Sequence, residues 1–122
     1  MTQAATERLF VYALLLRDDL RADTFGRRVT GEPDVLPGFR LGYTAFDLPQ
    51  AHGIDGSRRH PVARRTGHAS DKLVGELLSV TPAELEAADE YASPGYRRIS
   101  AVLASGHRAW VYVHPDRTGI AD

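Results

Sequence analysis

The segment from Leu73 to Ala92 constrains the fold most, because a strand passes there directly into a helix. Residues 73–80 are largely apolar and β-prone, a pattern that predicts a strand. Thr81-Pro82-Ala83-Glu84 then forms a capping box with proline at the first helical position. The helix must end by Ser93-Pro94-Gly95, since proline also restricts the residue before it. One face of this helix carries Leu85, Ala88, Asp89 and Ala92.

The rest of the chain predicts more strands than helices. Leu9–Tyr12 is short, apolar and β-prone, which is typical of a strand buried on both faces. Asp18–Arg28 mixes charged and apolar residues and predicts a short helix. We expect further strands at Phe39–Phe46, Tyr96–Leu103 and Arg108–Val113, the last two joined as a hairpin through a turn at Gly106.

Prolines and glycines indicate where the chain turns. They predict turns at 32–34 and at 36–38. Residues 47–71 are rich in Gly, Pro, His and Arg, so we expect long loops there, with a brief strand near Val62. These elements together predict an α+β fold, a small mixed β-sheet or β-barrel flanked by a few helices. The 122 residues are near the usual size of one domain, so we expect a single domain over 1–122.

Composition excludes several classes of function. The net charge of −1 implies neither a nucleic-acid partner nor an anionic membrane surface. The chain has no cysteine, which excludes disulfides and thiolate metal ligands and fits a cytoplasmic protein. The longest apolar run, Leu9–Leu16, is too short to span a bilayer, and no signal-peptide pattern follows it. The abundance of Ala, Arg and Asp indicates a bacterial source. A monomer or a homodimer would fit this composition.

Motifs for metals, phosphates and nucleophiles are missing. The histidines His52, His60, His68, His107 and His114 have no metal-ligand spacing, so we expect no metal. The basic run at 57–65 has no interleaved aromatic residue, and we interpret it as a solvated loop rather than a nucleic-acid contact. No glycine-rich phosphate loop and no Gly-x-Ser-x-Gly elbow is present.

Glu76 is the one carboxylate inside a predicted strand of apolar residues. It shares a face with Leu78 and Val80 if the strand is regular. Burial there would raise its pKa and suit it to general acid or base catalysis. A hydrogen-bonded or edge-exposed glutamate is the other interpretation.

Six segments, in order from residue 9 to 113, resemble the γ-glutamylcyclotransferase-like family. Leu9–Leu15 resembles its "FVYGTL" signature, and Val74–Val80 resembles "V.GELy.V". Residues 85–98 resemble "L..lD.yEg..Y.R". The remaining matches are Gly38–Leu41 to "GyrL", His60–Val62 to "YPa" and Ala109–Val113 to "a.vYv".

The resemblance implies a small mixed β-barrel flanked by helices and a reaction that needs no cofactor. In that family the α-amine of a γ-glutamyl compound attacks its own γ-carbonyl, which releases an amine and 5-oxoproline. A glutamate of the "yEg" segment is the acid/base, and the loop after the first strand holds the γ-glutamyl group through backbone groups. The implied small-molecule site includes Tyr12, Ala13, Leu14, Leu15, Tyr96, Arg98 and Tyr112.

Two positions depart from the family pattern. Ala13 and Leu14 stand where the family has Gly and Thr, which makes the loop more apolar and suggests a less polar substrate. Ala92 stands where the family has its glutamate, and a methyl group cannot move a proton. Glu90 cannot replace it, because it lies about 200° away around the helix axis.

Three explanations of Ala92 stay open. The chain is an engineered inactive variant, or an enzyme that uses another acid, or a non-catalytic binding protein that kept the fold. The candidate acids for the second case are Glu76, Asp89 and the pair Asp18-Asp19. We expect the working site just after the first strand in each case.

Overall fold

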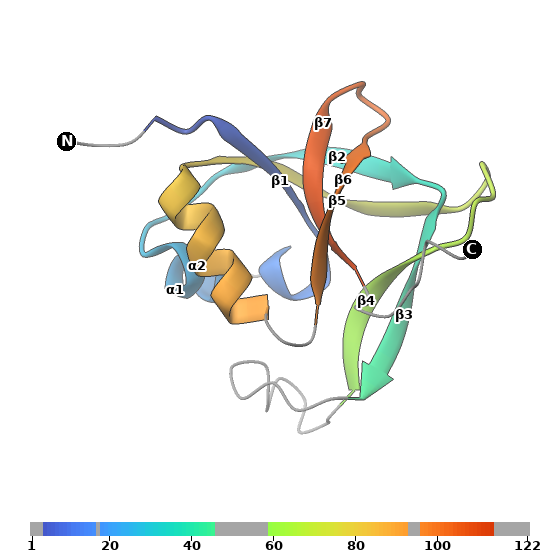
Figure 1. The fold of residues 1–122 in the computed structure, drawn as a ribbon, viewed down its shortest axis with the longest axis horizontal. Coiled ribbons are helices and arrows are strands. Elements are labelled where there is room, and N and C mark those ends of the chain that lie inside the picture. Colours follow the sequence, from blue (N-terminus) through green and yellow to red (C-terminus); the bar gives the residue numbers. More distant parts are fainter. Residues whose placement is uncertain (1–3, 17, 46–58, 93–95, 114–122) are drawn as a thin grey trace.

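The computed structural model describes residues 4–16, 18–45, 59–92 and 96–113, without the side chains of 14, 18, 43–45, 59 and 60. Ten elements follow one another along these residues (Figure 1). They are β1 (Glu7–Val11), η1 (Ala13–Leu16), α1 (Asp18–Phe25), β2 (Gly31–Pro37), β3 (Phe39–Ala45), β4 (Arg59–Arg65), β5 (Lys72–Val80), α2 (Pro82–Ala92), β6 (Arg97–Val102) and β7 (Arg108–Val113).

The strands form one mixed sheet in the order β2-β5-β1-β7-β4-β3, with β6 paired to β7. β7 runs parallel to β1 and to β4, and the other pairs are antiparallel. The predicted α+β class is therefore confirmed. Of the predicted sheet or barrel, the described residues form a sheet and not a closed barrel, because no ladder joins the end strands β2 and β3 and because the sheet branches at β7, which has three partner strands.

Residues 31–37 form a strand, so the turn predicted at 32–34 is wrong, whereas the turn predicted at 36–38 is found at Gly38, where φ is 82°. The strand pairs with β5 along its whole length, from Gly31 opposite Leu78 to Pro37 opposite Lys72. Proline lacks an N–H group, which is tolerated at an edge where no further strand pairs. The segment around Val62 is likewise a full strand of seven residues rather than a brief one. Helix α1 ends at Phe25, earlier than the predicted Arg28, because Gly26 takes the left-handed φ of 74°.

The apolar side chains of β1 alternate between two cores. Leu9 and Val11 face the helices and pack in one cluster with Leu85 and Ala92 of α2, while Phe10 belongs to a cluster on the opposite face. Both faces of β1 are therefore buried, as predicted. Figure 1 shows α1 and α2 on the same side of the sheet, so the ends of β1 and α2 come together there.

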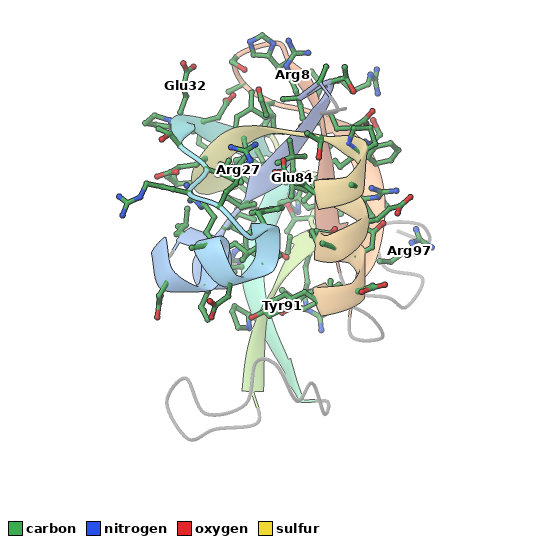
Figure 2. The ribbon with its side chains drawn as sticks, turned by 90° about the vertical axis from the view of Figure 1, so that its left-hand side faces the viewer. Arg8, Arg27, Glu32, Glu84, Tyr91 and Arg97 are labelled. Carbon is green, nitrogen blue, oxygen red and sulfur yellow. The ribbon has the colours of Figure 1, made fainter. Side chains whose placement is uncertain are left out.

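The predicted capping box is confirmed at the start of α2. The Thr81 hydroxyl accepts a hydrogen bond from the Glu84 N–H at 3.1 Å, and the Glu84 carboxylate accepts one from the Thr81 N–H at 2.9 Å. Arg27, beyond the end of α1, also binds this carboxylate through Nη2 at 2.9 Å (Figure 2). The box therefore joins the two helices as well as starting one of them. No helix among the described residues is long and apolar enough to cross a membrane.

Candidate functional site

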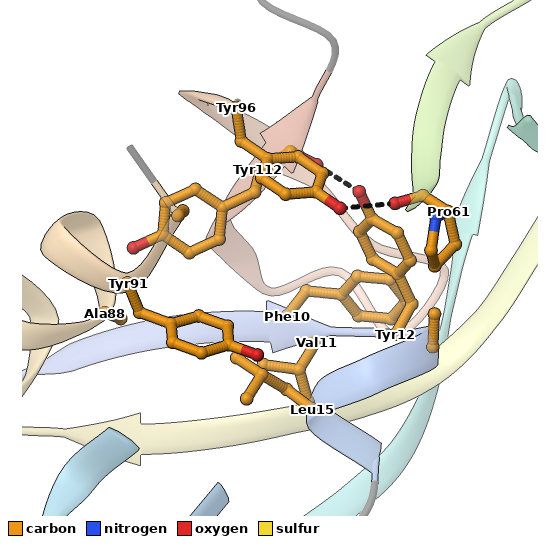
Figure 3. Close-up of a pocket in the computed structure, with 11 residues that line it drawn as sticks. Phe10, Val11, Tyr12, Leu15, Pro61, Ala88, Tyr91, Tyr96 and Tyr112 are labelled. Atoms are coloured by element: carbon orange, nitrogen blue, oxygen red, sulfur yellow. Dashed lines mark hydrogen bonds between the residues drawn. The ribbon is translucent and has the colours of Figure 1, made fainter. Parts of the chain in front are cut away.

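A cavity of about 50 Å³ lies where β1, η1, α2 and β7 meet (Figure 3). Its walls come from segments far apart in the sequence, including the loop after β1 and the last turns of α2. The described residues that line it are Phe10, Val11, Tyr12, Ala13, Leu15, Pro61, Ala88, Tyr91, Ala92, Tyr96 and Tyr112. The lining is therefore aliphatic and aromatic throughout.

Ala92 lies on this cavity, opposite the loop after β1. It is the last residue of α2, only 5% exposed, and its carbonyl accepts a hydrogen bond from the Tyr96 N–H at 3.1 Å. Helical spacing places Ala88 one turn earlier on the same face, and both methyl groups face the core. Position 92, where the family resemblance places a glutamate, therefore lines the same cavity as Ala13.

The backbone of the loop is held in an unusual conformation. Ala13 has φ of 52°, the left-handed region that favours glycine, so the chain turns sharply from β1 into η1. Arg21 of α1 fixes the far end of η1, because its Nε donates to the Leu15 carbonyl at 2.9 Å. Alanine at 13 is therefore strained where the family has glycine.

Three tyrosines of the lining use their hydroxyl groups inside the protein. The Tyr12 hydroxyl donates to the Tyr112 carbonyl at 2.6 Å and accepts from the Ala63 N–H at 2.8 Å. The Tyr96 hydroxyl donates to the Pro61 carbonyl at 2.6 Å, and the Tyr112 hydroxyl donates to Asp89 Oδ1 at 2.7 Å. These bonds join β1, β4, β7 and α2 around the cavity.

Burial raises the pKa of all three tyrosines above the ordinary value of a phenol. Burial is the largest cause for each, and the carboxylate of Asp89 raises the pKa of Tyr112 further. The phenols therefore stay protonated at neutral pH and serve as hydrogen-bond donors. None of them is suited to take a proton from a substrate.

The candidate carboxylates lie outside the described lining of the cavity. Glu76 accepts a hydrogen bond from Arg21 Nη2 at 2.9 Å and forms an ion pair with it. Asp89 lies behind Tyr112, and its other oxygen is 3.5 Å from Arg98 Nη1. Asp19 accepts from the N–H of Leu20. The side chains of Leu14 and Asp18 lie outside the described residues.

Arg98 does not reach the cavity either. Its guanidinium lies 4.4 Å from the centre of the Trp110 ring and pairs with Asp89. The family resemblance implied that Arg98 contacts the substrate. In the structure its guanidinium contacts the Trp110 ring and the Asp89 carboxylate instead. Tyr12, Ala13, Leu15, Tyr96 and Tyr112 do come together at the cavity.

Sequence reasoning missed several lining residues. Ala88 could have been found, because it lies one helical turn before Ala92 on the apolar face. Pro61 comes from β4, which β7 brings to the site by parallel pairing of Ala63 with Val113. No local pattern signals such a pairing.

The expectation of no metal stays a prediction. Among the described residues no group of three His, Cys, Asp or Glu side chains could hold a metal ion. The side chains of His52, His60 and His114 lie outside the described part of the chain. In the basic run at 57–65, residues 57 and 58 and the side chains of 59 and 60 lie outside it too, and Arg64 and Arg65 are exposed on β4.

No protein-family model matches the sequence, and no curated protein matches it. Several solved structures are similar to the structure of this chain. The protein At5g39720.1 of Arabidopsis thaliana matches with a TM-score of 0.70 and 17% identity over 98% of this chain and 76% of its own. A γ-glutamyl cyclotransferase matches with a TM-score of 0.66 and 14% identity over 88% of this chain and 66% of its own.

The same fold also occurs inside a larger enzyme. The allophanate hydrolase of Kluyveromyces lactis matches with a TM-score of 0.67 and 13% identity over 94% of this chain and 18% of its own. Identities this low establish the fold alone. The chain has the γ-glutamyl cyclotransferase-like fold.

Proposed function

We propose that this protein binds a small molecule in the cavity between Ala13 and Ala92 and does not form 5-oxoproline. One observation carries the proposal: Ala92, where resemblance expects the acid/base glutamate, lines the cavity with a methyl group. The cavity beside the loop after β1 supports a binding role, and its described lining holds no carboxylate at position 92.

The reaction of the family requires a base, because the attacking amine is protonated near neutral pH. The described lining offers phenols whose pKa is raised, and it offers no carboxylate or imidazole. Proximity alone would accelerate a cyclisation only once the amine had lost its proton. The geometry therefore favours binding over turnover.

The test compares the wild-type protein with Ala92→Glu and with the matched control Ala92→Gln. On titration with small amide compounds, we expect the backbone N–H resonances of residues around Ala13 and Ala92 to shift in the wild type. We also expect the wild type to release no 5-oxoproline from a panel of γ-glutamyl amines. Glutamine has the size of glutamate without its charge. Release of 5-oxoproline by Ala92→Glu but not by Ala92→Gln would therefore support position 92 as the ancestral acid site. Release of 5-oxoproline by the wild type would contradict the proposal.

A second candidate is an amide-converting enzyme that uses Asp89 through Tyr112. The observation in its favour is that the Tyr112 ring lines the cavity while its hydroxyl donates to Asp89 at 2.7 Å. A proton could pass from a substrate to Tyr112 only as Tyr112 passes its own proton to Asp89. Wild-type turnover of any amide that Asp89→Asn and Tyr112→Phe both abolish would favour this candidate.

A further inference from the structure

The uncharged character of the described lining limits what can enter the cavity. The eleven described residues of the lining are aliphatic, aromatic or phenolic, and none carries a charge at neutral pH. Arg21 and Asp89, charged side chains of the two helices, have partners of their own. Arg21 binds two carbonyls and Glu76, and Asp89 binds Tyr112 and Arg98.

A γ-glutamyl group carries an α-ammonium and an α-carboxylate, and each would lose water on entering. Transfer of an ionised group to an apolar site is strongly unfavourable unless an opposite charge or several hydrogen bonds replace the water. Tyr12, Tyr96 and Tyr112 each use their one O–H group inside the protein, so none of the three can donate to the carboxylate without breaking a bond that joins β1, β4, β7 and α2. The family's usual substrate head therefore fits this cavity poorly.

We infer that the ligand group that occupies this cavity is uncharged, apolar and short, so that the ligand belongs to a class other than γ-glutamyl compounds. The inference rests on the proposed binding function and narrows its ligand. Three alanines set the shape of the site, Ala13 on the loop and Ala88 and Ala92 on α2. The volume of about 50 Å³ is small beside the roughly 300–1,000 Å³ of pockets that enclose whole ligands, so a short alkyl group suits it.

The test uses two compounds with the same N-methylamide skeleton, N-methylbutanamide and γ-glutamylmethylamide. The second is the first with an added α-ammonium and α-carboxylate. Titration of the ¹⁵N-labelled full chain gives the affinity of each from the amide shifts of cavity residues. We expect N-methylbutanamide to bind at least tenfold more tightly. Within a series of N-methylamides, each added methylene should strengthen binding by about fourfold until the cavity is full.

Two variants on α2 locate the binding. Ala92→Leu fills the cavity and should weaken binding of N-methylbutanamide by more than tenfold. Ala83→Leu makes the same change at an exposed position of the same helix and should leave the affinity unchanged. Equal weakening by both variants would overturn the assignment of the cavity.

Failure of the inference and failure of the proposed function give different results. One outcome would overturn the inference but retain the assignment of the binding site. In it, γ-glutamylmethylamide binds more tightly than N-methylbutanamide, and Ala92→Leu abolishes that binding. Binding of neither compound, with a wild-type spectrum that shows a folded chain, would overturn both. Preference for the uncharged compound together with loss in Ala92→Leu supports both.

Discussion

Arg21 is buried on α1, and its Nη2 donates to Glu76 Oε1 on β5 at 2.9 Å. The same guanidinium donates through Nη1 to the Val29 carbonyl and through Nε to the Leu15 carbonyl, both at 2.9 Å. One side chain therefore ties η1, α1 and the segment before β2 to the sheet. The loop that carries Ala13 depends on this arginine for its position.

Replacement of Arg21 by alanine should destabilise the protein by about 2–4 kcal/mol, because it leaves two carbonyls and a carboxylate without their donor. The loss stays below that of a fully buried pair, since the Glu76 side chain is 35% exposed. Urea unfolding at neutral pH measures the effect. Arg28→Ala, at an exposed position nearby, serves as the control and should change stability by less than about 0.5 kcal/mol. Equal effects of the two variants would contradict this role of Arg21.

The sequence offered Glu76 as a candidate acid, and that role stays a prediction. In the structure its carboxylate pairs with Arg21 and lies outside the described lining of the cavity. A strand pattern tells which residues share a face, and it does not tell which charged side chain from another element meets them. Arg21 lies in a helix of mixed composition, where nothing local marks it as buried. The ion pair depends on how α1 packs against β5, and the local sequence pattern of either element does not reveal that packing.

Local patterns succeeded where local physics decides the structure. Thr81 and Glu84 fix the start of α2 through contacts within one turn, and β1 is apolar enough to predict its burial. The same reasoning failed for Pro33, because an edge strand accepts a proline that an inner strand would reject. The location of a site after β1 came from resemblance, and it stays a proposal that the cavity beside Ala13 and Ala92 supports.

Ala13→Gly should stabilise the protein by about 0.5–1 kcal/mol. The φ of 52° strains an alanine, and glycine adopts it at no steric cost, although glycine loses more entropy on folding. Thermal and urea unfolding measure the change. Ala87→Gly, inside α2 where φ is helical, is the opposite control and should destabilise by about 1 kcal/mol. Destabilisation by both substitutions would show that Ala13 is not strained in solution.

Gly75→Ala should cost about 3 kcal/mol or more, because the strands β1 and β5 approach too closely there for a side chain. An added Cβ would lie 2.1 Å from the Val11 carbonyl oxygen and 2.8 Å from Phe10 Cζ. Backbone atoms cannot move aside as a flexible side chain can. The measurement is again urea unfolding, with the amide spectrum reporting any shift of the cavity residue Val11.

Gly42→Ala is the matched control for Gly75→Ala. The atoms nearest its Cβ would belong to the side chain of Arg64, at 2.9 Å from Cδ and from Nε, and that exposed side chain can turn away. We expect a loss of less than about 1 kcal/mol. A loss at Gly42 equal to that at Gly75 would argue against close approach of the backbone as the cause.

Glu84 should make stability depend on pH in the acid range. Its hydrogen bonds from Arg27, and to a lesser degree from Thr81, lower its pKa in the folded protein, while the unfolded value stays at about 4.3. The folded state then binds fewer protons than the unfolded state around that pH. The stabilisation is present above the unfolded pKa and is lost as pH falls through the lower, folded pKa.

Glu84→Gln should therefore cost about 1 kcal/mol near neutral pH, and the difference from the wild type should vanish in acid. The cost stays modest, because the Arg27 side chain is 46% exposed and water screens the pair. Unfolding in urea at a series of pH values from about 7 to 3 measures the difference. Glu86→Gln, exposed on the same helix, should leave the pH profile unchanged. A gap between wild type and Glu84→Gln that persists at the lowest pH would mean that Glu84 stabilises α2 by its shape rather than by its charge.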